Sequence, residues 1–256
     1  MTATAWVRFS HQGVVRFGIL AGDRIEVHEG SMFERPIPTG QTLAVGEVAL
    51  RRPVQPSKVI ALWNNFGQLR EKLGLAVPPE PLYLVKTPNS YADPGSTIPV
   101  PEGQGKVVFE GELGIVIGRT ARRVPLDRAN DHVFGYTCAN DVTVADIITR
   151  DASFAQWVRA KSFDGFCPLG PTVVTGLDPR TLRVVTRLNG DTRQDYPISD
   201  MRFSVEQLVS LISHDMTLEP GDVILCGTSV GVGSMKPGST VEVEIGGIGT
   251  LVNRYG

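Results

Sequence analysis

Two glutamates and an aspartate are the residues whose types and spacing point most directly to chemistry. Glu110 and Glu112 lie in Phe109–Ile117, a segment with strand-like alternation, so both carboxylates project from one face, ~7 Å apart at their backbones. Like charges this close repel each other unless water or a cation lies between them. Asp141 lies in a later segment, Cys138–Thr143, where an apolar run ends in Asn-Asp. Three carboxylates without cysteine or histidine suit Mg²⁺, Mn²⁺ or Ca²⁺ rather than zinc.

Each of these acidic residues also has an ordinary structural explanation. Two glutamates at alternate positions fit the solvated face of an edge strand, and a single aspartate is most often a turn or helix-capping residue. Because spacing does not by itself bring the three carboxylates together, a metal site and a set of unrelated polar residues both stay open.

Other candidate motifs fail on their context. Gly227-Thr-Ser-Val-Gly231 matches the G-x-S-x-G nucleophile elbow, which requires a helix after the serine. Residues 232–238 (Val-Gly-Ser-Met-Lys-Pro-Gly) do not form a helix, and the last histidine, His214, precedes Ser229. The glycine clusters match no nucleotide-binding loop, and the four histidines are scattered. A serine hydrolase, a nucleotide-binding protein and a zinc site are therefore unsupported.

Short strands are the main elements available to position the acidic residues. Glycine and proline, 28 and 18 residues, separate short apolar or alternating segments. Strands are predicted at Trp6–Phe9, Val14–Leu20, Arg24–His28, Lys58–Trp63, Glu112–Ile117, Leu182–Leu188, Val223–Cys226 and Val241–Ile245. Helices are predicted after Asn64 or Asn65, where Phe66, Leu69 and Leu73 have helical spacing, from Ser204 with Gln207 in a capping box, and within residues 146–160.

The fold class that follows is mainly β (α+β), because strands outnumber helices and do not alternate with them regularly. Residues 1–53 are predicted to form a small N-terminal β subdomain, and residues 54–256 the main domain. Prolines mark an irregular connection between the two: Pro36, Pro38, Pro53 and Pro56.

Composition excludes several classes of protein. The 256 residues are 41% hydrophobic and 20% charged, which rules out disorder, and a net charge of −2 gives no sign of a nucleic-acid partner. Apolar runs such as Val59–Trp63 are far shorter than the ~20 residues that span a bilayer, and the N-terminus does not resemble a signal peptide. Three cysteines without a close pair indicate reduced thiols. We expect a soluble cytoplasmic protein without a membrane partner.

Four motifs, from about residue 58 to the C-terminus, resemble the fumarylacetoacetate hydrolase family. They are Phe-Glu-Gly-Glu-Leu-Gly-Ile-Val-Ile-Gly (109–118), Gly-Tyr-Thr-Cys-Ala-Asn-Asp-Val-Thr (135–143), Ala-Lys-Ser-Phe-Asp-Gly-Phe-Cys-Pro-Leu-Gly-Pro (160–171) and Leu-Glu-Pro-Gly-Asp-Val-Ile-Leu-Cys-Gly-Thr (218–228). Within the family, the third motif and Leu-Val-Lys-Thr-Pro-Asn-Ser (84–90) are most similar to the homoprotocatechuate-pathway branch, which decarboxylates 5-oxopent-3-ene-1,2,5-tricarboxylate and isomerises 2-hydroxyhepta-2,4-diene-1,7-dioate.

This resemblance implies a mixed β-roll or sandwich core and usually a homodimer. It also implies a divalent metal, Mg²⁺ or alternatively Mn²⁺ or Ca²⁺, at Glu110, Glu112 and Asp141. By the same resemblance, Gly227 and Thr228 lend backbone or hydroxyl donors to a substrate carboxylate.

Three further polar residues are candidates through the same motifs. The resemblance implies that Lys161 reaches the substrate's oxygens, although most lysines are surface charges. Asp164 is expected either to orient Lys161 or to shape a turn. Lys86, at the end of a strand, is either a substrate-binding residue or an ordinary structural lysine.

One departure from the family bears on the reaction. Hydrolases of the family resemble one another in a histidine and a nearby glutamate after the first core strand, where this chain has Leu69 and Lys72. Leu69 is therefore expected to pack in the core, and Glu71 to be solvated. Without that pair to activate water, decarboxylation and isomerisation are favoured, since they need electron withdrawal and modest proton transfer.

The expected function is metal-dependent decarboxylation and/or keto–enol isomerisation of an unsaturated 2-oxo (2-hydroxydienoic) dicarboxylate from aromatic catabolism. The metal would chelate the 2-oxo acid and stabilise an enolate. Two alternatives stay open. One is another reaction on this scaffold: acylpyruvate hydrolysis, oxaloacetate decarboxylation or a hydratase/dehydratase step. The other is a non-catalytic subunit that binds a ligand or a partner.

Overall fold

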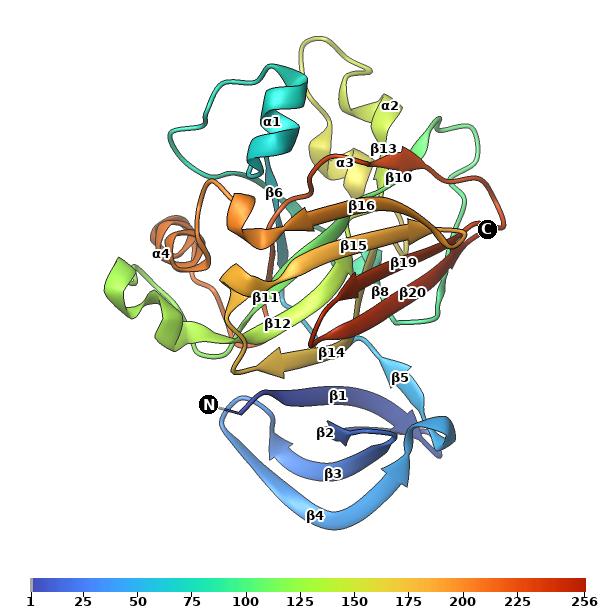
Figure 1. The fold of residues 1–256 in the computed structure, drawn as a ribbon, viewed down its shortest axis with the longest axis vertical. Helices are drawn as coiled ribbons and strands as arrows, with labels where there is room; N and C mark the ends of the chain where they lie inside the picture. The colour runs from blue at the N-terminus through green and yellow to red at the C-terminus, as the bar shows by residue number, and fades with distance from the viewer. Residues whose placement is uncertain (1) are drawn as a thin grey trace.

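A computed structural model describes residues 2–256 as short strands with a few helices (Figure 1). The strands are β1 (Thr4–His11), β2 (Val14–Ala21), β3 (Arg24–Ser31), β4 (Arg35–Ala44), β5 (Ala49–Arg51), β6 (Val59–Trp63), β7 (Leu82–Lys86), β8 (Tyr91–Ala92), β9 (Thr97–Ile98), β10 (Val107–Phe109), β11 (Gly111–Ile117), β12 (Val133–Asn140), β13 (Thr143–Val144), β14 (Cys167–Thr175), β15 (Arg183–Leu188), β16 (Asp191–Pro197), β17 (Val223–Leu225), β18 (Gly233–Ser234), β19 (Thr240–Ile245) and β20 (Gly249–Tyr255). The α-helices are α1 (Gly67–Leu73), α2 (Ala145–Ile148), α3 (Trp157–Lys161) and α4 (Val205–Asp215).

The largest sheet is mixed and curls into a roll. Its strand order is β4-β3-β2-β1-β14-β12-β11-β17-β6-β7, and β17 and β6 run parallel. Beyond β7 the chain returns through β8, which pairs in parallel with β14. The strands from β14 to β7 therefore enclose an interior, and the prediction of a mainly β chain with a mixed β-roll core is confirmed.

The core lies on both faces of β11. Leu113, Ile115 and Ile117 face a second sheet of order β16-β15-β19-β20-β9, and they share a buried cluster with that sheet's Val184 and Val243. The opposite face of the roll strands carries a second cluster, which contains Val116, Ala139 and Leu225. This alternation is the one predicted for the segment. It places Glu112 on the face of Val116, inside the roll.

The N-terminal strands form a meander with its own small core, below the roll in Figure 1. Strand β1 also pairs with β14, so the meander extends the large sheet. The prediction of an irregular connection at Pro36 and Pro38 is wrong, because both lie in β4. Strand β4 is at the sheet edge, where a residue without an N–H leaves no ladder bond unmade. The division of the chain at residue 53 stays a prediction.

Helix α4 begins at its predicted signal, whereas the N-cap of α1 is Phe66, which makes no side-chain cap bond, and not the predicted Asn64 or Asn65. Ser204 caps α4, and its side chain and that of Gln207 form the predicted capping box. Helix α1 begins at Gly67, but its Leu73 is 48% exposed and Leu69 is only half-buried, so the expected core packing of Leu69 is wrong. Residues 146–160 are helical in part, as predicted, through α2 and α3.

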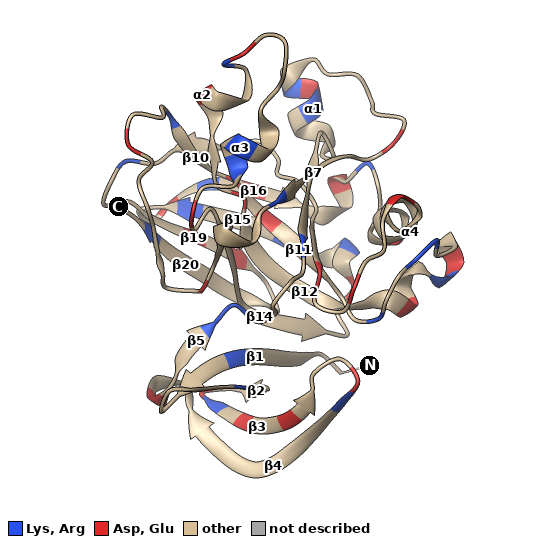
Figure 2. Cartoon of the chain, turned by 180° about the vertical axis from the view of Figure 1, so that it is seen from behind, with Lys and Arg blue, Asp and Glu red and all other residues tan. Residues whose placement is uncertain are grey.

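The outer surface is mixed in charge. Lysine and arginine are interspersed with aspartate and glutamate on the face in Figure 2. Within residues 2–256, the helices are too short or too polar to cross a membrane.

Candidate metal centre

The three acidic residues converge at one end of the roll. Glu112 lies on β11, Glu110 immediately before this strand, and Asp141 immediately after the neighbouring β12. The antiparallel register pairs Glu112 with Ala139, which brings Asp141 beside Glu110, and the Asp141 N–H donates to the Glu110 carbonyl oxygen at 2.8 Å. One carboxylate oxygen from each residue lies within 4.8 Å of the other two. Because Glu112 is fully buried between β12 and β17, a solvated edge strand is excluded.

Two buried lysines contact this acidic trio. Lys161, the last residue of α3, places Nζ 2.8 Å from Glu110 Oε2 and 2.7 Å from Asp141 Oδ2. Lys86, the last residue of β7, places Nζ 2.5 Å from Asp141 Oδ1. Lys161 is 3% exposed and Lys86 is 0% exposed, so neither is a surface charge. The two ammonium groups form ion pairs with Asp141 and Glu110, and neither contacts Glu112.

Of the three carboxylates, Glu112 therefore has the fewest neighbouring groups that stabilise its negative charge. Its Oε2 accepts from the Gly227 N–H at 2.8 Å, whereas its Oε1 is buried and meets no hydrogen-bond donor within residues 2–256. Burial raises the pKa of Glu112 well above its ordinary value, and repulsion from Asp141 and Glu110 adds to this shift. A divalent cation among the three carboxylates would supply the missing positive charge, and hard oxygen donors are its preferred ligands. The trio therefore fits a metal.

Burial and the lysines act in opposite directions on the other two carboxyl groups. Burial raises the pKa of Glu110 despite the Lys161 ammonium beside it. Burial also opposes ionisation of Asp141, but Lys161 and Lys86 together hold its pKa below the ordinary value. The pKa of Lys161 is raised because Asp141 and Glu110 outweigh its desolvation. Asp141 is therefore ionised and Lys161 protonated at neutral pH.

The turn at Gly227 and Thr228 supports the trio. Gly227 has φ of +87°, in the region that favours glycine, and its N–H donates to Glu112. The Thr228 hydroxyl donates to the Gly111 carbonyl oxygen at 3.1 Å and accepts from Gln194 Nε2 at 2.7 Å. These donors, expected to bind a substrate carboxylate, are hydrogen-bonded within the protein, so their substrate role stays a prediction.

Asp164 lies outside the trio's hydrogen-bond network. It is exposed, and its Oδ1 accepts from Asn89 Nδ2 at 2.7 Å. Asn89 Nδ2 also donates to the Ser162 carbonyl oxygen at 3.0 Å. These bonds favour the turn-shaping alternative for Asp164 over the orientation of Lys161.

Three residues that hydrogen-bond to the trio or to the Gly111 peptide beside it were not predicted from the sequence. Thr143 accepts from Lys161 Nζ at 2.7 Å and donates to Glu110 Oε1 at 3.0 Å. Gln194 and Tyr196, on β16, hydrogen-bond the Gly111 peptide groups. Thr143 could have been found from its place two residues after Asp141. Gln194 and Tyr196 have no signal in the sequence, because only the packing of the two sheets brings them to Gly111.

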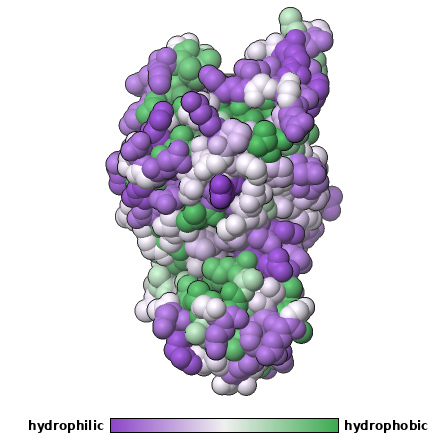
Figure 3. All heavy atoms as spheres, turned by 90° about the vertical axis from the view of Figure 1, so that its right-hand side faces the viewer, coloured by the Kyte–Doolittle hydropathy of each residue, from purple (hydrophilic) through white to green (hydrophobic). Residues whose placement is uncertain are grey.

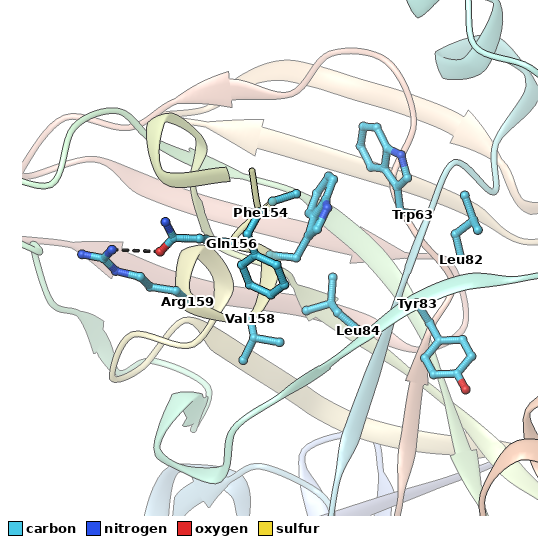
Figure 4. Close-up of a pocket in the computed structure, with 10 residues that line it drawn as sticks. Trp63, Leu82, Tyr83, Leu84, Phe154, Gln156, Val158 and Arg159 are labelled. Atoms are coloured by element: carbon cyan, nitrogen blue, oxygen red, sulfur yellow. Dashed lines mark hydrogen bonds between the residues drawn. The ribbon is translucent and has the colours of Figure 1, made fainter. Parts of the chain in front are cut away.

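A cavity of about 770 Å³ opens beside α3 (Figure 4). It lies at the end of the molecule that carries α1, α2 and α3, where Figure 3 shows two arms separated by a notch. Its walls are mostly apolar and come from β6, β7, α3 and the segment that leads into α3: Trp63, Leu82, Tyr83, Leu84, Phe154, Ala155, Gln156, Trp157, Val158 and Arg159.

The cavity shares two elements, α3 and β7, with the two lysines that contact the trio. Lys161 follows Trp157 by one turn of α3, and Lys86 follows Leu84 on the same face of β7. The rings of Trp63 and Trp157 lie 4.9 Å apart between their centroids. Arg159 Nη1 donates to Gln156 Oε1 at 2.9 Å on the same wall (Figure 4).

Comparison with known proteins gives consistent matches along the chain. Residues 58–255 match the fumarylacetoacetate hydrolase C-terminal family, and residues 5–53 match the Rv2993c-like N-terminal family. Protein Rv2993c of Mycobacterium tuberculosis is 41% identical over 86% of this chain and 83% of its own length. Oxaloacetate tautomerase YisK of Bacillus subtilis is 34% identical over 93% of this chain and 85% of its own length.

A solved structure matches both parts of the chain together. The crystal structure of 2-hydroxyhepta-2,4-diene-1,7-dioate isomerase from Mycobacterium marinum aligns with a TM-score of 0.90 and 36% identity. The alignment covers 98% of this chain and 98% of that protein. The N-terminal meander and the roll are therefore parts of one shared architecture.

Proposed function

The chain belongs to the fumarylacetoacetate hydrolase family, and from this premise we propose that it is a divalent-metal-dependent isomerase and/or decarboxylase. Its substrate would be an unsaturated 2-oxo or 2-hydroxydienoic dicarboxylate from aromatic-ring breakdown. The observation that carries the proposal is the buried trio, in which Glu112 Oε1 has no hydrogen-bond partner among residues 2–256 although two lysines pair with the other two carboxylates. Mg²⁺ or Mn²⁺ fits these oxygen donors, with Ca²⁺ as an alternative.

Glu110, Glu112 and Asp141 would hold the cation. When bound, the cation supplies Lewis-acid polarisation of the oxygens of a 2-oxo acid. The residues of the chain must then place a second positive charge near the oxygen on which negative charge develops, and must hold a proton there.

Lys161 is suited to that role. Its ammonium is buried and protonated, and a fixed charge acts strongly in a site from which water is excluded. Because Lys86 also contacts Asp141, Lys161 can turn toward a substrate oxygen without leaving Asp141 unpaired. Lys161 Nζ would then donate a hydrogen bond to the enol oxygen, while Thr143 keeps its bond to Glu110.

Helix α1 favours a proton shift or loss of CO₂ over hydrolysis. The positions at which hydrolases of the family resemble one another in histidine and glutamate carry Leu69 and Lys72, which do not deprotonate water. None of the four histidines hydrogen-bonds the trio within residues 2–256. Hydrolytic cleavage would need a base from elsewhere.

The similarity to an oxaloacetate tautomerase supports a second candidate, keto–enol exchange of a four-carbon 2-oxo diacid. Both candidates move a proton next to a 2-oxo acid, and they differ in the length of the substrate. None of the three acidic residues or the two lysines lines the cavity beside α3, so its volume does not measure the room at the trio. Its mostly apolar walls suit the carbon chain of the longer unsaturated substrate better than a four-carbon acid.

A substrate panel with and without EDTA tests the proposal. We expect isomerisation of a seven-carbon 2-hydroxydienedioate, CO₂ release from 5-oxopent-3-ene-1,2,5-tricarboxylate, or both. Turnover should be lost in EDTA and recovered with Mg²⁺ or Mn²⁺. Hydrolysis of acetylpyruvate at an ordinary enzymatic rate, about 10 s⁻¹, would replace the proposal with a hydrolase. Binding without turnover across the panel would favour the non-catalytic alternative. The family resemblance also supports a homodimer, which light scattering tests.

A further inference from the structure

The peptide of Gly111 connects two members of the trio, and its hydrogen bonds do not come from a neighbouring strand. Strand β17 pairs with β11 from Gly114 to Val116 and ends at Leu225. The N–H and C=O of Gly111 point to the edge of β11 along which β17 pairs, but β17 ends before it reaches Gly111. These buried peptide groups therefore need other hydrogen-bond partners.

Two side chains of the second sheet provide most of these partners. Gln194 Oε1 accepts from the Gly111 N–H at 3.0 Å, and the Tyr196 hydroxyl donates to the Gly111 carbonyl oxygen at 2.6 Å. Gln194 Nε2 also donates to Thr228 Oγ1 at 2.7 Å and to the Ser229 carbonyl oxygen at 3.2 Å. Gln194 therefore links the Glu110–Glu112 segment to the turn whose Gly227 N–H binds Glu112.

The backbone around these residues is shaped for close approach. Strand β16 has a bulge, because Thr186 of β15 pairs with Gln194 while Arg187 pairs with Thr192, which leaves Arg193 as an extra residue. A bulge re-aims the side chains next to it. At Gly111, an added Cβ would lie 2.0 Å from Thr186 Oγ1, so only glycine lets the second sheet pack this closely behind the trio.

We propose that Gln194 and Tyr196 are positioning residues that hold the Gly111 peptide plane and thereby set the geometry of Glu110 and Glu112 as metal ligands. This inference rests on the proposed function, since it requires that the trio binds a metal. Gln194 and Tyr196 touch neither substrate nor ion, and they act through the backbone between the two glutamates. Supporting partners of ligands typically change metal affinity by about 10–100-fold.

The test compares Tyr196→Phe and Gln194→Met with Tyr83→Phe in the full chain. Each of the first two substitutions keeps most of the side-chain volume and removes the bonds to Gly111. The control removes a surface hydroxyl that donates to Asp215 instead. The probe is Mn²⁺, whose affinity is measured by calorimetry and whose ligand geometry is followed by its electron paramagnetic resonance spectrum. Melting in EDTA measures stability without metal.

We expect about tenfold weaker Mn²⁺ binding and an altered Mn²⁺ spectrum for Tyr196→Phe and Gln194→Met, and neither change for Tyr83→Phe. Wild-type Mn²⁺ affinity and spectrum in both site variants would overturn the inference, whatever their melting temperatures, and would leave the proposed function standing. Failure of the wild-type protein itself to bind Mn²⁺ would overturn the proposed function and this inference together.

Discussion

Lys86 and Asp141 form a completely buried ion pair across the interior of the roll, with Nζ 2.5 Å from Oδ1. The two residues are 55 positions apart and lie at the ends of strands that are not neighbours in the sheet. Asp141 has a second partner in Lys161, which also pairs with Glu110. Each lysine can therefore be substituted alone, and its effects on stability and on turnover compared.

Substituting Lys86 should chiefly reduce stability. Lys86→Met removes one partner of a buried carboxylate, and breaking a buried pair from one side typically costs about 3–5 kcal/mol. We expect a lower melting temperature in EDTA and a larger recovery on adding Mn²⁺ than for the wild type, because the cation restores positive charge. Melting curves with and without Mn²⁺ check this, with exposed Lys106→Met as the control. Equal melting temperatures for the two variants would contradict it.

Substituting Lys161 should chiefly reduce turnover. In Lys161→Met, the positive charge proposed to lie near the substrate oxygen is lost, and a loss of about 10²–10³ in kcat is expected. Mn²⁺ affinity should be retained or increased, because an ammonium no longer competes for Glu110 and Asp141. Steady-state kinetics and calorimetry test this together, with Lys72→Met on α1 as the control. An unchanged kcat would remove Lys161 from the mechanism.

Glu112 should respond in opposite directions with and without metal. Glu112→Gln neutralises a buried carboxylate that has an unpartnered oxygen, so the melting temperature in EDTA should not fall and should rise if the carboxylate is charged. Mn²⁺ affinity should fall by more than about 100-fold, beyond the usual cost of losing a supporting partner. The exposed Glu219→Gln serves as control. Retained Mn²⁺ binding by Glu112→Gln would show that the trio is not the metal site.

The cavity beside α3 should select for substrate length. Trp157→Ala removes a wall of the cavity, and we expect KM for a seven-carbon 2-hydroxydienedioate to rise about tenfold, the cost of losing roughly 1.4 kcal/mol of contact. KM for oxaloacetate should stay within about twofold. Kinetics measured in parallel on the two substrates check this. An equal rise in KM for both would mean that the cavity does not discriminate substrates by length.

The link between the N-terminal sheet and the roll should weaken in acid. Asp93 binds Arg51 Nη1 at 3.0 Å and the Arg52 N–H at 2.9 Å, and these contacts hold the pKa of Asp93 below its ordinary value although burial opposes them. A lowered folded-state pKa means that the stabilisation is fully present above the unfolded-state pKa, about 3.9, and is lost as the pH falls below it.

Asp93→Asn gives this prediction a measurement. The variant should be less stable than the wild type in urea at pH 7, and the difference should shrink steadily below about pH 4. Asp191→Asn, at an exposed position of β16, is the control and should show little difference at either pH. A difference between Asp93→Asn and the wild type that stays constant down to pH 2.5 would contradict the assignment.

Local patterns in the sequence predicted much of the fold and half of the site. Strand alternation placed Glu110 and Glu112 on one face and Leu113 on the other, and the capping box placed the start of α4 at Ser204. These predictions hold because strand and helix periodicities act over a few residues and need no knowledge of distant segments. The irregular connection predicted at Pro36 and Pro38 was wrong for the same reason, because a local pattern does not reveal that a strand lies at the edge of a sheet.

The acidic residues, and through the family resemblance Lys161, were thus available from the sequence alone. Only the tertiary structure decided that Lys86 contacts Asp141, that Gly227 and Thr228 support the trio from within, and that Gln194 and Tyr196 hold Gly111. The physical reason is that these contacts join segments far apart in the chain. Their existence depends on the order of the strands, the closure of the roll and the packing of one sheet against another, none of which leaves a short-range pattern in the sequence.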